Sequence, residues 1–513
     1  MAQAILFQGV GLSCCVQSQG EQASCSGMCC ASILFETLVS CLVLGMQAKH
    51  RDYDPPCRKS PIFEALSTSA AGGSPNEAQE LVVFGGKGSA WVKGRGNKRE
   101  TVEILGDMWT FDTDKGTWSE PRLLPSGDSI DGPLQRWKSI STVINDGREM
   151  VVFGGCKTSG THGVMNDLWV FTMQGFNQGN WRQVTTLNPP AARRAHNVEA
   201  NSTHLIVFGG KTEAANYVEG VSLRDEPHDR ILKDVWTLPL SALHESAQGK
   251  AQWSKGADFP ALGRWGTTGT ILTAPDGREI LAVFGGRHLY KGFVTHTTDS
   301  RAYKYESELW FYDTSANIWE LQRPRGSLPP ARDHHAAARI GSDLYVYGGR
   351  GKEVRTHDAL LGDLWSYSLE ADRWTQHFWA SESPSNRYMP GAAQFLQDGV
   401  AKLAVFGGES FPAGDRASTK HSTMNDLWLF DPRPGGGWEQ LSANDCSKGK
   451  SGNHQSPVNS VPALKLAGAV DGISSMQTWA LAGAAALLAS YAAYVVQGRA
   501  FHGRETQYQF LSG

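Results

Sequence analysis

The sequence lacks a strong net charge, and only 19% of its 513 residues are charged. The formal net charge of −3 excludes a global field that would recruit nucleic acid or an acidic membrane, so we expect no nucleic-acid partner. No P-loop, nucleophile motif or glycine-rich dinucleotide motif occurs at a strand–turn–helix, so we expect no cofactor of those kinds. Charge effects in this chain have to be local.

Cysteine is scarce outside the first tenth of the chain. Six of the nine cysteines lie before residue 45, which leaves Cys57, Cys156 and Cys446 for the remainder. No CxxC pair is followed by a second pair at zinc spacing, and this excludes the usual structural zinc sites.

Glycine and tryptophan are abundant instead, with 57 and 17 residues, a profile typical of a turn-rich all-β protein. One strand ending in Gly-Gly recurs six times. Its copies are LVVFGG at 81–86, MVVFGG at 150–155, LIVFGG at 205–210, LAVFGG at 281–286, LYVYGG at 344–349 and LAVFGG at 403–408. Such self-similarity predicts a repeat architecture.

A second motif follows each Gly-Gly pair, with an acidic residue two positions before a tryptophan. The acidic residues are Asp107, Asp167, Asp234, Glu308, Asp363 and Asp426. A lone tryptophan comes next, at Trp118, Trp181, Trp253, Trp319, Trp374 and Trp438. An extended run precedes each Gly-Gly strand, so each unit is predicted to be a four-stranded meander. Six meanders arranged radially bury faces that one sheet leaves exposed.

The paired glycines after an aromatic residue, the acidic-hydrophobic-Trp strand and the spaced Trp resemble the kelch repeat. The resemblance implies an all-β fold, a six-bladed kelch-type β-propeller over 58–442. It also implies a module that binds protein partners with its long inter-strand loops. Residues 1–57 are too short for the BTB or F-box domain of kelch ubiquitin-ligase adaptors, which argues against that role.

The flanks of the repeats indicate a membrane protein. Residues 478–496 are uncharged and mostly apolar, and as a helix they would span about 28 Å, close to the thickness of a bilayer core. We therefore expect a single C-terminal transmembrane α-helix, preceded by a polar linker at 443–475 and followed by a short tail at 497–513. The alternative is an Ala-rich helix packed on the propeller.

Two topologies follow from these flanks. The apolar stretch at 33–48 resembles a signal peptide ending near 45–48, although Glu36 interrupts it. A cleaved signal would place the propeller in the extracellular or luminal space, and Arg499 and Arg504 in the tail favour this orientation. The competing topology is a tail-anchored cytosolic scaffold.

Basic and aromatic residues in the loops after the Gly-Gly pairs and at the blade entries are the candidate binding residues. Arginine beside exposed aromatics is a hot-spot composition and holds anions in a bidentate way, so an acidic peptide or anionic glycan is the expected partner group. The candidates are Lys93, Arg95, Lys98, Arg136, Arg194, Arg264, Tyr290, Arg332 and Arg387. In the alternative interpretation, the entry arginines pair with the acidic residues that precede each repeated tryptophan.

Three further expectations concern chemistry and modification. Some kelch-type propellers are copper or iron enzymes, and His196, His334 and His335 lie at blade entries, but no ligand set can be assigned, so we expect a binding protein rather than an enzyme. The sequon at Asn201 predicts a glycan on the face opposite the long loops. Cys57 and Cys446 flank the repeats, so closure of the ring should bring them together as a disulfide in an oxidising compartment. The alternative is two unrelated free thiols in flexible flanks.

Overall fold

The computed structural model describes residues 54–68, 79–93, 98–125, 132–158, 163–213, 229–244, 251–289, 303–354, 357–410, 422–443 and 446. The predicted signal peptide and the predicted membrane helix at 478–496 lie outside these residues. Within the described part of the chain, no helix is both long and apolar enough to cross a membrane.

The described chain forms six antiparallel four-stranded meanders, numbered here in chain order. The first comprises β2 (Ile62–Ser67), β3 (Gln79–Lys93), β4 (Lys98–Asp112) and β5 (Thr117–Ser119). The second comprises β7 (Ile140–Ile144), β8 (Glu149–Cys156), β9 (Val164–Met173) and β10 (Gln178–Val184). The third comprises β12 (Asn197–Ala200), β13 (His204–Phe208), β16 (Val235–Pro239) and β18 (Ser254–Lys255).

The remaining meanders follow the same order of strands. The fourth comprises β19 (Trp265–Thr273), β20 (Glu279–Leu289), β22 (Leu309–Asp313) and β23 (Ile318–Leu321). The fifth comprises β24 (Ala336–Ile340), β25 (Asp343–Tyr347), β28 (Leu364–Ser368) and β29 (Arg373–His377). The sixth comprises β30 (Gly391–Gln397), β31 (Val400–Ser410), β32 (Ser422–Phe430) and β33 (Trp438–Ser442).

Short elements decorate these meanders. The short strands are β1 (Arg58–Lys59), β6 (Arg122–Leu123), β11 (Thr186–Leu187), β14 (Lys211–Glu213), β15 (Asp229–Ile231), β17 (Ala251–Gln252), β21 (Tyr303–Tyr305), β26 (Arg350–Val354) and β27 (His357–Leu360). The 3-10 helix η1 (Leu240–Leu243) is the one helical element among the described residues. Four meanders are separate sheets, and the sixth and first share a nine-stranded sheet because β1 pairs with both β3 and β32.

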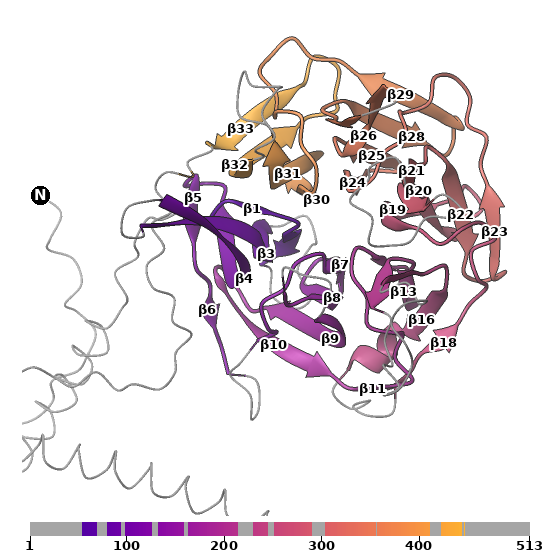
Figure 1. Cartoon of the computed structure of the whole chain (residues 1–513), viewed down its shortest axis with the longest axis horizontal. Helices are drawn as coiled ribbons and strands as arrows, with labels where there is room; N and C mark the ends of the chain where they lie inside the picture. Colours follow the sequence, from indigo (N-terminus) through magenta and orange to yellow (C-terminus); the bar gives the residue numbers. More distant parts are fainter. Residues whose placement is uncertain are drawn as a thin grey trace, which may run out of the picture. The chain divides into compact units, whose positions relative to one another are not determined.

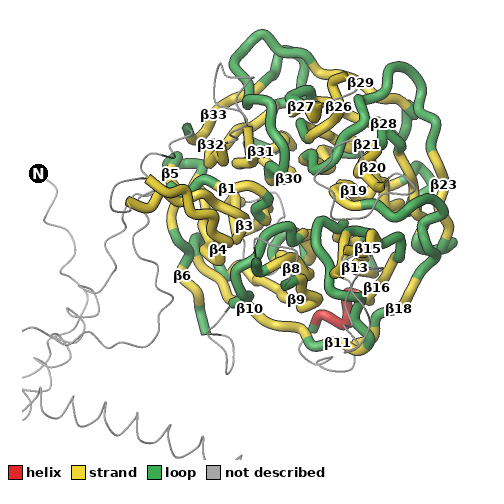
Figure 2. Tube along the Cα trace, in the orientation of Figure 1, coloured by secondary structure: helices red, strands yellow, loops and turns green. Residues whose placement is uncertain are grey.

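The meanders stand around a common centre, with β7, β19, β24 and β30 nearest to it and β10, β18, β23, β29 and β33 outside (Figure 1). Loops and turns join the strands within and between the meanders, as the green segments of Figure 2 show. The fold is therefore all-β and propeller-like, as the kelch resemblance implies.

Apolar side chains fill every junction between neighbouring meanders. Each of six hydrophobic clusters contains side chains of two neighbouring meanders. The clusters lie between the first and second meanders, then between each later pair, and finally between the sixth meander and the first. Each spaced tryptophan packs on the aromatic residue that precedes Gly-Gly in the previous meander. The pairs are Trp118–Phe406, Trp181–Phe84, Trp253–Phe153, Trp319–Phe208, Trp374–Phe284 and Trp438–Tyr347, with ring centroids 4.9 to 5.5 Å apart. Buried aromatic area of this kind is a main source of stability at such junctions.

The Gly-Gly pairs let the backbones of neighbouring meanders touch. Gly85 and Gly86 have φ of +62° and +104°, which disfavour other residues. A Cβ atom on Gly85 would lie 2.7 Å from the carbonyl oxygen of Arg136 in the second meander. The Gly86 N–H donates to that same oxygen over 2.8 Å. Each pair therefore marks the place where one sheet is joined to the next.

Candidate functional site

The entry arginines predicted to bind a partner are internal parts of the fold. Arg136, Arg264, Arg332 and Arg387 are at most 3% exposed, and each forms an ion pair with the acidic residue of its own meander. A buried guanidinium that is already paired cannot serve a partner, so the binding role assigned to these four residues is wrong. The alternative interpretation, pairing with the repeated acidic residues, describes the arrangement found.

The arrangement repeats in all six meanders. The pairs are Arg58–Asp107, Arg136–Asp167, Arg193–Asp234, Arg264–Glu308, Arg332–Asp363 and Arg387–Asp426. In each case the acidic residue also accepts a hydrogen bond from the indole N–H two residues later. The repeated acidic-hydrophobic-Trp motif is thus a structural device.

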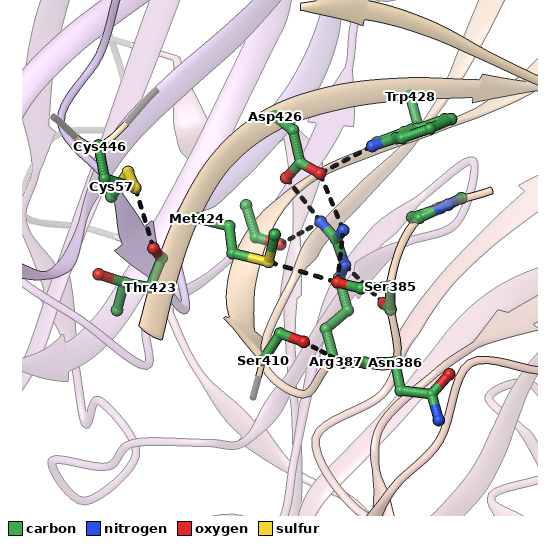
Figure 3. A network of polar contacts seen from close by, with 12 residues as sticks. Cys57, Ser385, Asn386, Arg387, Ser410, Thr423, Met424, Asp426, Trp428 and Cys446 are labelled. Carbon is green, nitrogen blue, oxygen red and sulfur yellow. Dashed lines mark hydrogen bonds and ion pairs between the residues drawn. A yellow bond between two sulfur atoms is a disulfide. The ribbon is translucent and has the colours of Figure 1, made fainter. Parts of the chain in front are cut away.

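The sixth meander shows one such network in full (Figure 3). Arg387 donates through Nη1 and Nη2 to the two carboxylate oxygens of Asp426, over 2.7 and 2.9 Å. Its Nη1 also donates to the carbonyl oxygen of Gly407, and its Nε donates to that of Ser385. Trp428 donates to Asp426 over 2.8 Å. Every donor direction of the guanidinium is occupied by the fold.

A closed circle of hydrogen bonds lies two residues beyond the entry arginines, where the chain enters each first strand. Its members have left-handed backbones, with φ between 49° and 66°: Ser60, Lys138, Ala195, Gly266, His334 and Met389. Five backbone N–H groups donate to the carbonyl oxygen of the neighbouring member over 2.7 to 3.0 Å, and the Lys138 N–H donates to the Ser60 hydroxyl over 3.1 Å. We call this circle the inner ring, and it encloses the common centre because it passes through all six meanders.

The residues next to the inner ring carry mostly charged and aromatic side chains. They follow the entry arginines and the Gly-Gly pairs, and we call them, with Lys138 and His334, the axial cluster. Its members are Lys59, Lys87, Trp137, Lys138, Cys156, Arg194, Lys211, Trp265, Arg287, Asp333, His334, Arg350, Tyr388 and Glu409. Antiparallel bridges place the two residues from each meander side by side, as in Lys59 opposite Lys87 and Asp333 opposite Arg350.

Aromatic rings of the axial cluster lie between cations from neighbouring meanders. The Trp137 ring has the Nζ atoms of Lys87 and Lys138 at 4.5 and 4.4 Å from its centroid. The Trp265 ring has Lys211 Nζ at 4.0 Å and Arg287 Cζ at 4.7 Å. Such contacts stabilise cations at the ring faces and hold them in place.

The cluster contains seven lysines and arginines but two carboxylates, Asp333 and Glu409. Asp333 forms ion pairs with Arg287 over 2.9 Å and with Arg350 over 3.4 Å, and it bonds His334 Nδ1 over 2.8 Å. Burial alone would raise the pKa of Asp333, but Arg287, Arg350 and His334 lower it. Glu409 forms an ion pair with Lys59. Both carboxylates belong to the fifth and sixth meanders.

The first three meanders supply five cations to the axial cluster: Lys59, Lys87, Lys138, Arg194 and Lys211. Burial and the positive charges of Arg194, Arg287, Lys211 and Lys59 hold the pKa of Lys138 well below its usual range. Burial and Lys59 likewise lower the pKa of Lys87. Cations gathered in this way favour the approach of an anion.

Several other predicted residues have a definite place. Arg194 belongs to the axial cluster, whereas its neighbour Arg193 is the structural arginine. Lys93 and Lys98 pair at the end of the β3–β4 hairpin. Arg95 and Tyr290 lie outside the described residues. Lys138 is not among the predicted residues, although it lies two residues after the entry arginine Arg136 in the sequence.

The predicted glycosylation site at Asn201 is largely buried in the folded chain. Asn201 is 8% exposed, and its side-chain N–H donates to the Thr314 hydroxyl over 3.1 Å. Its side-chain oxygen accepts hydrogen bonds from the N–H groups of Thr203 and His204. The Asn201 side chain is thus largely held by contacts of the fold, and the glycan at Asn201 stays a prediction.

The histidines considered for metal binding are also buried. His334 bonds Asp333, His335 bonds the Thr268 hydroxyl, and the His196 ring packs edge-on against Phe153. Burial lowers the pKa of His196 to about 3 and that of His334 to about 4. Among the described residues, no three His, Cys, Asp or Glu side chains come together in a group that could hold a metal ion.

Cys57 and Cys446 form a disulfide, with Cα atoms 5.6 Å apart (Figure 3). The pairing expected from ring closure is therefore present. The segment around Cys57 is part of the fold, because Pro55 accepts a hydrogen bond from Asn425 over 2.9 Å. The described propeller thus begins a few residues before the predicted boundary at 58.

Comparison with known families agrees with the repeat geometry. The family model described as the KLHDC2/KLHL20/DRC7 Kelch-repeats domain matches residues 55–244 and 263–461. The chain belongs to this kelch-repeat family. Domains of this family are typically protein-interaction modules.

Individual relatives are distant. Kelch domain-containing protein 2 of Bos taurus is 24% identical over 57% of this chain and 66% of its own length. Kelch domain-containing protein 10 of Xenopus tropicalis is 25% identical over 58% of this chain and 61% of its own length. Host cell factor 1 of Homo sapiens is 28% identical over 31% of this chain and 7% of its own length. The kelch chain thus spans less than two thirds of each of these relatives.

Proposed function

We propose that the six meanders are the blades of one six-bladed kelch propeller, which binds a protein partner by an anionic group at the axial cluster. The observation that carries this proposal is the excess of seven cations over two carboxylates around the inner ring. These side chains are partly open to solvent, with Lys59, Arg287 and Arg350 between 14% and 17% exposed. Focused positive charge of this kind raises the local concentration of an anionic ligand.

The anion is expected nearer to the first three blades than to the others. Asp333 and Glu409 place negative charge in the fifth and sixth blades. These carboxylates already form ion pairs with Arg287, Arg350 and Lys59. Lys138, Arg194 and Lys211 lie on the other side of the cluster. An acidic peptide fits this asymmetry. Its carboxylates would accept hydrogen bonds from the cations, while its other groups would face the part of the cluster that also contains Asp333 and Glu409.

The predicted loop residues extend this proposal beyond the centre. Lys93 and Lys98 pair at the last described residues of β3 and β4, and Arg95 and Tyr290 follow β3 and β20 in the sequence. Contacts from such loops would add specificity around a central anion. An anionic glycan is the alternative partner group, and it would use the same cations.

Fluorescence polarisation with labelled peptides tests the proposal. The probes are an Asp/Glu-rich peptide and its Asn/Gln counterpart of the same length, measured against the full chain. We expect the acidic peptide to bind at least tenfold more tightly, and affinity to fall as salt rises from low to physiological concentration. Equal binding of the two peptides would overturn the proposal.

Two variants locate the site. Lys211→Met removes a cation from the axial cluster, and Lys255→Met makes the same change on the outer strand β18, where Lys255 pairs with Asp258. We expect Lys211→Met to weaken the acidic peptide at least fivefold and Lys255→Met to leave it within twofold. Equal losses in both variants would show that the attraction comes from overall charge rather than from the cluster.

Membrane attachment through 478–496 and an extracellular or luminal propeller are also proposals. The Cys57–Cys446 disulfide supports the compartment, because such bonds persist where conditions are oxidising. Protease treatment of intact membranes tests the topology. The protease is added to sealed vesicles whose cytosolic face is outward. Protection of the propeller would support the luminal topology, and its digestion would favour the tail-anchored cytosolic alternative.

A further inference from the structure

We propose that the Cys57–Cys446 disulfide is a redox switch for the axial cluster. The bond holds the segment 57–60, which supplies Lys59 to the cluster and Ser60 to the inner ring, and reduction of the bond releases this segment. The effect on an anionic ligand rests on the proposed function. Release of the segment, by contrast, can be measured on the full chain without any ligand.

The segment lies across the junction between the first and sixth blades. On the side of the first blade, it continues directly into β2, which begins at Ile62. On the side of the sixth blade, Arg58 pairs with Met424 of β32, and Lys59 forms an ion pair with Glu409 of β31 over 2.5 Å. Among the described residues, the disulfide is the one covalent bond that closes this junction.

The two residues at the end of the segment belong to the proposed binding site. Lys59 Nζ donates to the Tyr388 hydroxyl over 3.4 Å and lies 5.5 Å from the centroid of that ring. The Ser60 N–H donates to the Met389 carbonyl oxygen over 2.7 Å, and the Ser60 hydroxyl accepts from the Lys138 N–H over 3.1 Å. Ser60 therefore carries the inner ring from the sixth blade into the second.

Release of the segment would change the charge of the axial cluster. The departure of Lys59 leaves six lysines and arginines in the cluster. Glu409 loses its ion pair with Lys59, and a carboxylate without that neighbouring cation opposes an anionic ligand. Reduction therefore weakens the binding of an acidic peptide in two ways, through the lost cation and through the carboxylate that it had neutralised.

The sulfur of Cys446 is the one more open to attack, because Cys446 is half-buried whereas Cys57 is 6% exposed. A thiolate of a dithiol reductant attacks this sulfur, forms a mixed disulfide and releases the Cys57 thiolate. The second thiol of the reductant then displaces the Cys446 thiolate and closes the reductant into a cyclic disulfide. Two electrons and two protons pass to the two cysteines. The Cys446 sulfur lies 3.1 Å from the Thr423 carbonyl oxygen, to which the reduced thiol can donate (Figure 3).

Hydrogen exchange in the full chain tests the release of the segment. Exchange is read residue by residue by mass spectrometry, before and after treatment with dithiothreitol. The His334 amide is the matched control, because it makes the same type of inner-ring hydrogen bond, to Gly266 over 2.8 Å, away from the closing junction. We expect reduction to accelerate exchange of the Ser60 amide at least tenfold more than exchange of the His334 amide. Equal acceleration of the two amides, or none at Ser60, would overturn the inference.

A double variant tests whether the bond itself is the cause. Cys57→Ser, Cys446→Ser cannot form the disulfide, so its Ser60 amide should exchange as fast as in the reduced chain. Dithiothreitol should not change that rate. A Ser60 amide that exchanges in the double variant as slowly as in the oxidised chain would contradict the inference.

Fluorescence polarisation with the labelled Asp/Glu-rich peptide tests the consequence for binding, at a temperature at which circular dichroism shows the reduced chain to be folded. We expect reduction to weaken the peptide at least threefold, and the double variant to bind it as the reduced chain does. An unchanged affinity despite release of Ser60 would overturn the switch and leave the proposed function standing. If the oxidised chain does not bind the peptide, the proposed function fails, and the exchange of Ser60 decides whether the disulfide holds the segment.

Discussion

Cys57 and Cys446 are 389 residues apart in the sequence, yet their Cα atoms lie 5.6 Å apart and their sulfur atoms are bonded. The bond sits beside β1, whose residue Arg58 pairs with Gly88 of the first blade and with Met424 of the sixth. The disulfide therefore fastens the one junction of the ring that has no continuous chain across it.

Removal of this bond should destabilise the propeller. The chain-entropy model gives up to about 5 kcal/mol for so long a loop, and measured losses are often about 2–4 kcal/mol. We expect the double variant Cys57→Ser, Cys446→Ser to unfold at lower urea concentration than the unmutated chain. Dithiothreitol should destabilise the unmutated chain by a similar amount and leave the double variant unchanged. An effect of dithiothreitol on the double variant would point to another disulfide.

The buried ion pairs should differ in cost according to their exposure. The Asp426 side chain is 3% exposed and the Asp167 side chain 22%, although both accept from an arginine and an indole. Breaking a fully buried pair costs about 3–5 kcal/mol because the remaining charge stays desolvated. We expect Asp426→Asn to lower the free energy of unfolding clearly more than the isosteric Asp167→Asn. Equal losses in the free energy of unfolding, measured by urea melts, would show that water solvates the unpaired arginine equally well at both sites.

The repeats made the blades and their closure predictable. The Gly-Gly strands, the spaced tryptophans and the start of the first strand at Ile62 all follow from local pattern. Even the disulfide followed, because ring closure constrains where the two ends of the repeat array must meet.

The roles of the arginines were less accessible. Arg58 lies four residues before the first strand, as Arg136 does in the second blade, and this constant offset was the available signal for the sixth buried arginine. In the Arg193-Arg194 pair, sequence alone could not distinguish the structural residue from the one in the axial cluster. That cluster is made by side chains of different blades, and their distances depend on how the ring closes.

A glycine substitution can isolate the contact at the closing junction. Gly407 has φ of +61°, and a Cβ atom there would lie 2.8 Å from the carbonyl oxygen of Arg58. Gly116 has φ of +66° and open space around the same position. Alanine at either site pays a similar left-handed backbone cost of about 1–2 kcal/mol. We expect Gly407→Ala to lose about a further 1–3 kcal/mol from overlap, measured by urea melts. Similar losses in the free energy of unfolding at the two sites would mean that the backbone at the junction moves to accommodate the Cβ atom without a measurable loss of stability.

The carboxyl group of Glu64 should make stability depend on pH. Glu64 lies in β2 and accepts a hydrogen bond from the Ser141 hydroxyl of the second blade over 2.6 Å. Burial raises its pKa from 4.5 to about 7, although the bond from Ser141 opposes the shift. Between these pH values the folded chain holds a proton that the unfolded chain has lost. The contribution of Glu64 to the free energy of unfolding therefore falls as the pH rises from about 4.5 to 7.

Glu64→Gln removes this titration and keeps the shape of the side chain. At pH 8 we expect the variant to be more stable than the unmutated chain by about 3 kcal/mol, because the buried charge is gone. Near pH 4.5 the difference should shrink toward zero, since Glu64 is then neutral in the folded state. Glu320→Gln makes the same change at an exposed position of β23 and controls for the substitution itself. Urea melts across this pH range measure the difference in stability between Glu64→Gln and the unmutated chain. A difference that does not vary with pH would contradict a buried, titrating carboxyl group at Glu64.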